Sequence, residues 1–129
     1  MPMDIYVEEI ISHYEHPHNK GKLDGSDADF HEDNPLCGDE ITMHIRIRGD
    51  KMDGVSFDGD GCAISMGAAS MLTDYVKGRS LDEVKGMGYE KVKELLGIDP
   101  GPVRMKCAVL SLKALHGAIL LYEQHSRKT

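Results

Sequence analysis

The stretch Glu40-Ile-Thr-Met-His-Ile-Arg-Ile-Arg-Gly-Asp-Lys-Met-Asp-Gly-Val-Ser-Phe57 decides the fold, because apolar and polar residues alternate along its first half. Apolar side chains occupy every second position from Ile41 to Ile47, and polar ones occupy the positions between them. A period of two predicts a strand with one buried face. Residues 49–51 are typical of a turn, and the alternation resumes at Val55 and Phe57, which predicts an antiparallel hairpin. Residues 27–31 are expected to add a third strand.

Helical patterns surround this hairpin. An N-terminal helix is predicted from an apolar stripe at helical spacing, with Asp4 as its N-cap: Val7, Ile10, Ile11 and Tyr14. Further helices are predicted over 64–77, over a short segment opened by the capping box at 80–83, over 89–96, and from Cys107 toward the C-terminus. The expected fold class is α+β, with a three-stranded antiparallel sheet packed against helices and a long C-terminal helix.

Length and composition narrow the classes of protein. A chain of 129 residues predicts one domain over residues 1–129. No apolar run reaches the roughly 18 residues that a membrane span needs, so no membrane partner is expected. The net charge of −7 repels phosphate backbones and argues against nucleic acid as a partner.

The charge is distributed unevenly. Residues 24–60 hold eleven Asp/Glu and three Lys/Arg, whereas residues 104–129 hold five Lys/Arg and one Glu. These regions are either solvated faces or a pair of functional surfaces, and in the second case the basic last helix would meet an acidic partner.

Three cysteines cannot all pair with one another, and the N-terminal Met-Pro-Met-Asp does not lead from basic residues into an apolar segment. We therefore expect a reducing, cytoplasmic environment, in which cysteines are more often metal ligands or nucleophiles than disulfides.

Each cysteine falls where one predicted element gives way to another. Cys37 precedes the alternating strand, Cys62 leads into a helix, and Cys107 is predicted to open the last helix. A helix start favours the thiolate form that metals and sulfur chemistry require. The separations of 25 and 45 residues exclude a CxxC ribbon or finger, so spacing alone is a weak metal signal.

Asp39 strengthens the interpretation of the cysteines as one site. Three thiolates need a fourth ligand, and a carboxylate two residues after Cys37 can supply it. Glycines at 38, 59 and 61 would clear space for an inorganic group and present backbone N–H groups to it. The alternative is that the cysteines are three small buried apolar residues.

Several motifs follow one another in an order that resembles the U-type iron–sulfur cluster assembly scaffolds, the IscU/NifU-like family. The resemblance runs from about residue 4 to residue 123 and rests on these stretches: Asp4-Ile-Tyr-Val-Glu-Glu-Ile-Ile-Ser-His-Tyr14, His16-Pro-His-Asn19, Asn34-Pro-Leu-Cys-Gly-Asp39, Gly61-Cys-Ala-Ile-Ser65, Ser70-Met-Leu-Thr-Asp-Tyr-Val-Lys-Gly78 and Val103-Arg-Met-Lys-Cys107.

The resemblance implies a scaffold, not an enzyme, that builds a [2Fe–2S] cluster from iron and desulfurase-derived sulfur and passes it to apo-proteins. Cys37, Cys62 and Cys107 would be the cluster ligands and sulfur acceptors, with Asp39 as the fourth ligand. A cysteine desulfurase and apo iron–sulfur proteins would be the partners, and two scaffolds could meet as a homodimer with facing clusters. The alternative is a zinc-bound sulfur acceptor, in which the same residues hold Zn²⁺; a purely structural zinc module is a third hypothesis.

The chain departs from the family pattern at two places. Lys106 replaces the His that commonly precedes the last cysteine, and a lysine ammonium has no lone pair for a metal. We expect Lys106 to pair with Asp39 or to lower the pKa of a cysteine; the alternative is a solvated lysine at a helix start. The segment 99–104 replaces the Leu-Pro-Pro-Val-Lys segment that a dedicated chaperone reads, which leaves a chaperone partner open. The zinc-dependent branch carries a longer insert between its second and third cysteines than this chain does.

Other residues receive structural interpretations. Four histidines near the N-terminus suggest a metal site by type, but their predicted places around a helix end and a loop favour structural or solvated roles: His13, His16, His18 and His31. The eight methionines are expected to fill gaps in a core with few aromatic residues. Tyr6 matches an aromatic position of the family and would either touch a partner or pack in the core.

Overall fold

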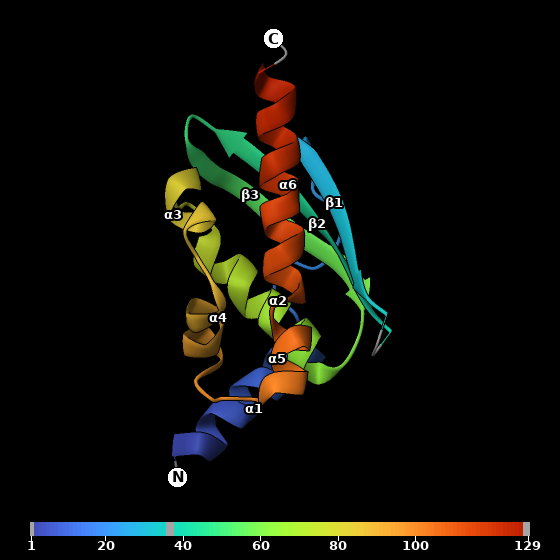
Figure 1. Cartoon of the computed structure of the whole chain (residues 1–129), viewed down its shortest axis with the longest axis vertical. Coiled ribbons are helices and arrows are strands. Elements are labelled where there is room, and N and C mark those ends of the chain that lie inside the picture. The colour runs from blue at the N-terminus through green and yellow to red at the C-terminus, as the bar shows by residue number, and fades with distance from the viewer. Residues whose placement is uncertain (1, 36–37, 128–129) are drawn as a thin grey trace.

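The computed structural model describes residues 2–35 and 38–127 of the chain (Figure 1). Its helices and strands follow the order helix, three strands, helices, as the sequence predicts. Their bounds are α1 Pro2–Glu15, β1 Ala28–Asn34, β2 Asp39–Arg48, β3 Lys51–Asp60, α2 Ala63–Val76, α3 Leu81–Lys85, α4 Tyr89–Leu96, α5 Pro102–Ala108 and α6 Leu110–Arg127.

The three strands form an antiparallel sheet in the order β1-β2-β3, which confirms the predicted fold class. In the β2–β3 hairpin, Met43 lies opposite Phe57 and Ile45 lies opposite Val55. Gly49 closes the hairpin with a φ of +62°, a backbone conformation that glycine adopts without steric cost. The predicted third strand forms too, and it extends past residue 31 to Asn34.

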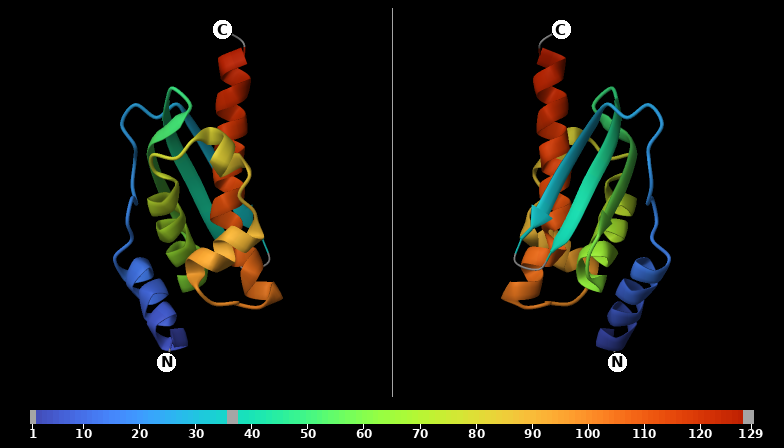
Figure 2. Two further views of the ribbon diagram at one scale, coloured as in Figure 1. Left: turned by 90° about the vertical axis from the view of Figure 1, so that its left-hand side faces the viewer. Right: turned by 90° about the vertical axis from the view of Figure 1, so that its right-hand side faces the viewer.

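The helices cover one face of the sheet. Helix α6 packs on β1 and β2, helix α2 packs on β3, and α1 lies on α2 (Figures 1 and 2). The apolar alternation of β2 supplies the sheet side of the core, while Leu115 and Ile119 of α6 supply part of the facing side. Met43 and Met52 are completely buried there, as expected for gap-filling methionines.

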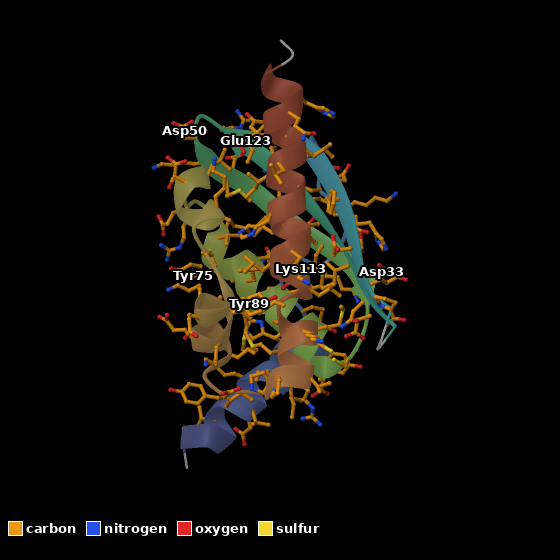
Figure 3. All side chains as sticks on the ribbon, in the orientation of Figure 1. Asp33, Asp50, Tyr75, Tyr89, Lys113 and Glu123 are labelled. Atoms are coloured by element: carbon orange, nitrogen blue, oxygen red, sulfur yellow. The ribbon has the colours of Figure 1, made fainter. Side chains whose placement is uncertain are left out.

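The last helical segment is long and apolar. By length and composition alone, residues Pro102–His125 could cross a membrane, but 56% of the window is buried inside this fold. Burial of that kind is typical of a core helix, and Lys113 projects from the exposed side of α6 (Figure 3). Glu123 on the same helix accepts a hydrogen bond of 2.8 Å from Lys85 of α3.

Helix α1 differs from the sequence prediction in two ways. It begins at Pro2, so Asp4 lies inside its first turn and is not the N-cap. Of the predicted stripe only Ile10 is buried, whereas Val7, Ile11 and Tyr14 are 39–44% exposed. The reason is that α1 packs mainly on α2, where Gly67 has no side chain and lets Ile10 approach closely. Because α1 packs on a single helix and not on the sheet, a narrower strip of its surface is buried.

Candidate metal centre

Three elements bring Asp39, Cys62 and Cys107 together. Asp39 is the first residue of β2, Cys62 is the N-cap of α2, and Cys107 lies near the end of α5. One donor atom from each residue lies within 4.8 Å of the others. Cys37, the remaining predicted ligand, lies outside the described residues. The β2 strand start and the α2 helix start therefore meet at one end of the sheet.

Cys62 and Asp39 contact each other directly. The backbone N–H of Cys62 donates to Asp39 Oδ1 at 3.2 Å, and Cys62 Sγ lies 3.5 Å from Asp39 Oδ2. Cys62 Sγ also accepts from the backbone N–H of Ser65 at 3.5 Å. These contacts fix the position of the Cys62 sulfur at the N-terminus of α2. The prediction that Cys62 opens a helix is confirmed.

The exposure of the three side chains is unequal. Asp39 is 4% exposed and Cys107 is 6% exposed, while Cys62 is exposed to solvent. A buried carboxylate is costly unless its oxygens receive hydrogen bonds. The Cys62 N–H supplies one of these bonds to Asp39, so strand and helix hold the carboxylate in place and leave one thiol open to a partner.

The glycines near the site, expected to clear space for an inorganic group, make room for protein atoms. A Cβ on Gly61 would lie 2.9 Å from the Asp39 carboxyl carbon and 2.5 Å from Ser65 Oγ. Gly61 therefore makes room for the carboxylate itself. A Cβ on Gly59 would lie 2.1 Å from the backbone oxygen of Glu40, so Gly59 permits the close approach of β3 to β2. Gly38 is exposed, and its φ of +75° shapes the turn before Asp39.

The structure differs from the sequence predictions at Cys107 and at the neighbouring Lys106. Cys107 does not open a helix, because α5 begins five residues earlier at Pro102, whose ring is pre-shaped for the first helical position. Of these two cysteines, Cys62 lies at a helix N-terminus and Cys107 does not. Lys106 is exposed, and among the described residues its ammonium forms no ion pair, so the expected pairing with Asp39 is not present.

Ser65 is the contributor that the sequence reasoning missed. It is fully buried, its N–H reaches Cys62 Sγ, and its hydroxyl donates to the Cys62 carbonyl oxygen at 3.0 Å. Its place three residues after an N-cap is the position where capping contacts form, and that spacing could have identified it.

The donor set suits soft or borderline metals. Thiolates are the ligands of iron–sulfur clusters and of zinc, and a carboxylate oxygen is a harder and weaker ligand for cluster iron. Cys62 Sγ, Cys107 Sγ and an Asp39 oxygen are close enough to contact one small inorganic group. This chemistry fits an iron–sulfur cluster and a zinc ion equally well.

Residues 5–129, nearly the whole chain, match the NifU-like N terminal domain. The chain belongs to this family. Among its relatives, the zinc-dependent sulfurtransferase SufU of Bacillus subtilis (strain 168) is 35% identical, with 89% of each chain covered. The iron–sulfur cluster assembly scaffold protein IscU 1 of Archaeoglobus fulgidus is 31% identical, with 96% of this chain and 80% of the relative covered.

A solved structure shares the fold of this family member. The putative iron–sulfur cluster assembly scaffold protein for the SUF system of Fervidobacterium islandicum AW-1 superposes with a TM-score of 0.71 at 25% identity. That match covers 90% of this chain and 97% of the other. The family resemblance inferred from the ordered motifs is thus confirmed.

Proposed function

We propose that this protein is a scaffold on which a [2Fe–2S] cluster is assembled from iron and desulfurase-derived sulfur and from which it passes to apo-proteins. The observation that carries the proposal is the convergence of Asp39, Cys62 and Cys107 within 4.8 Å. Cys37 would complete the ligand set. Relatives that are named iron–sulfur cluster assembly scaffolds add support.

Each residue has a defined part in this proposal. The three thiolates bind iron and receive sulfur, and the Asp39 oxygen holds the position from which the cargo is released, because it is the weakest of the four ligands. Sulfur delivery requires an accessible cysteine sulfur. Cys62 meets that requirement: its sulfur attacks the outer sulfur of a desulfurase persulfide, forms a new S–S bond and leaves the donor cysteine as a thiolate.

The partners follow from this chemistry. We propose a cysteine desulfurase as sulfur donor and apo iron–sulfur proteins as acceptors, in the cytoplasm, with residues 1–129 acting as one scaffold domain. Residues 99–104 run from the connector after α4 into the first turn of α5, where Val103 is 78% exposed. A chaperone that reads this segment is a further possible partner.

The second candidate function is a zinc-bound sulfur acceptor. The Bacillus subtilis relative, 35% identical, is named a zinc-dependent sulfurtransferase, and that name favours this candidate. In it, Asp39 and the cysteines would hold Zn²⁺, and one of the cysteines would accept sulfur. Both candidates use the same residues, so the identity of the bound inorganic group separates them.

Anaerobic reconstitution with ferrous iron, a desulfurase, cysteine and dithiothreitol, which reduces the delivered persulfide sulfur to sulfide, tests the proposed function. We expect about two iron and two acid-labile sulfide ions per chain, together with visible charge-transfer absorption, because thiolate-bound clusters give that signature. The matched control is Cys62→Ser, which we expect to lose the sulfide and the visible absorption. Stoichiometric zinc that a cluster cannot replace would instead favour the sulfur-acceptor function.

We also propose that two cluster-loaded chains meet as a homodimer with facing clusters. Support comes from the exposure of Cys62, which places one edge of the site at the surface. Multi-angle light scattering of the loaded protein is expected to show twice the monomer mass at high concentration, and the cluster-free protein is the control. A loaded protein that stays monomeric at every workable concentration would remove this proposal.

A further inference from the structure

A second group of metal-ligand side chains lies at the other end of α2. His13 of α1, His18 of the following loop and Asp74 near the end of α2 each offer one ligand atom, and these atoms lie within 4.8 Å of one another. Asp74 follows Cys62 by 12 residues along α2, which corresponds to about 18 Å of helix rise. This group is therefore separate from the cysteine site.

Hydrogen bonds hold the three side chains together. His18 Nδ1 lies 2.5 Å from Asp74 Oδ2, and the His13 and His18 rings are 4.5 Å apart between centroids. His13 Nδ1 lies 2.6 Å from the Ser70 hydroxyl, which also accepts from the His18 backbone N–H at 2.8 Å. Asn19 donates to the other Asp74 oxygen at 2.8 Å. The loop after α1 is thus fastened to one face of α2.

These bonds resemble the support that metal ligands normally have. A ligating histidine usually bonds through its second ring nitrogen to a neighbouring group, and a ligating carboxylate is itself hydrogen-bonded. When His13 Nδ1 donates to Ser70, its Nε2 keeps the lone pair that a metal needs. Asn19 similarly occupies Asp74 Oδ1, while Oδ2 pairs with His18 Nδ1, so a metal ion that binds both atoms takes the place of the proton they share.

The site is open to solvent. The side chain of His18 is 55% exposed and that of Asp74 is 43% exposed, whereas His13 is half-buried. A metal ion can enter from one side and keep water in its remaining positions. Two imidazoles and one carboxylate with open positions suit Zn²⁺, Fe²⁺ or Co²⁺ and not Ca²⁺ or Mg²⁺, which prefer oxygen ligands.

We propose that His13, His18 and Asp74 form a second site that binds one divalent first-row transition-metal ion independently of the cysteines. The structural interpretation of these histidines, in which they only clamp the loop to α2, is the competing explanation. The proposal does not depend on the scaffold function, because none of the three residues belongs to the cysteine site.

Anaerobic Co²⁺ titration of the full chain tests the proposal, since thiolate ligands give Co²⁺ a near-ultraviolet charge-transfer band and histidine and carboxylate ligands do not. We expect one equivalent to produce that band and a second equivalent to bind without it, as followed by calorimetry and by shifts of the histidine ring resonances. In His18→Gln and in Asp74→Asn, the second equivalent should bind at least about tenfold more weakly, because one of three ligands is lost. The thiolate band should be unchanged.

The control variant is His125→Gln, which removes an exposed histidine of α6 that does not belong to the group of His13, His18 and Asp74. It should bind both equivalents as the unchanged chain does. Three results would overturn the proposal. One is that the second equivalent of Co²⁺ fails to bind at all, and another is that its affinity is unchanged in both His18→Gln and Asp74→Asn. The third such result is an equal loss of affinity in His125→Gln. Far-ultraviolet circular dichroism establishes that each variant is folded, and two independent substitutions keep the test decisive if one is not.

Discussion

Replacement of Gly59 by alanine is expected to lower the free energy of unfolding by about 3 kcal/mol or more. Gly59 has a φ of +152°, and an added Cβ would lie 2.1 Å from the backbone oxygen of Glu40 and 2.9 Å from the Cα of Ile41. Both neighbours are backbone atoms of β2, so neither can rotate away. Strain at Gly59 and separation of β3 from β2 therefore both oppose folding.

Urea denaturation followed by circular dichroism measures this loss, which should be visible as a lower midpoint at an unchanged slope. Gly86→Ala is the matched control. Its φ is −81° and its added Cβ would meet only ordinary contacts at 3.6 Å and beyond. We expect that variant to stay within about 0.5 kcal/mol of the unchanged chain. Equal stability of the two variants would contradict the role given to Gly59.

The sheet could be predicted from the sequence because its signal is local. Alternation from Ile41 to Ile47 determines which face is buried, and Gly49 determines where the chain turns. The capping contact from Ser80 to Glu83 is equally local, since its donor and acceptor are three residues apart. Features that depend only on residues close together in the chain can therefore be predicted from the sequence.

The exposure of most of the apolar stripe of α1 could not be predicted. An apolar stripe indicates that the helix packs against another surface, but it does not indicate the width of that surface. Ile10 meets α2 at Gly67, while Ile11 and Tyr14 extend past that contact. Cys107 was misplaced for a related reason. The helical pattern continues through the junction at Val109, so periodicity did not reveal that Pro102 starts a separate helix.

The residues that meet at the candidate site could be predicted from the sequence, but the way the fold holds them could not. Residue types and ordered motifs predicted that Asp39 shares a site with the cysteines. In the structure, donor atoms of Asp39, Cys62 and Cys107 lie within 4.8 Å of one another. The buried state of Asp39 and the need for Gly61 beside it depend on how β2 and α2 meet in space. The same holds for His13, His18 and Asp74, which come from three separate segments.

Replacement of Asp39 by alanine should slow transfer of the cluster to an acceptor protein, by about tenfold if the carboxylate acts as a ligand. The carboxylate is the weakest of the four proposed ligands, so it gives way first when an acceptor thiolate approaches the iron. Without it, we expect a stronger ligand to take that position, which the acceptor thiolate would displace more slowly. Loss of Asp39 also leaves the Cys62 N–H without its acceptor at 3.2 Å, which loosens the start of α2.

Anaerobic transfer to an apo-ferredoxin, followed by visible circular dichroism, measures the rate. Asp60→Ala is a suitable control, because it removes another carboxylate near the end of β3, one that is exposed and lies outside the proposed ligand set. That variant should transfer its cluster at the unchanged rate. Transfer from Asp39→Ala that is as fast as from the unchanged chain, or faster, would mean that the carboxylate is not the position of release. In that case the buried Asp39 would serve to anchor the N-terminus of α2, and its loss would register in stability alone.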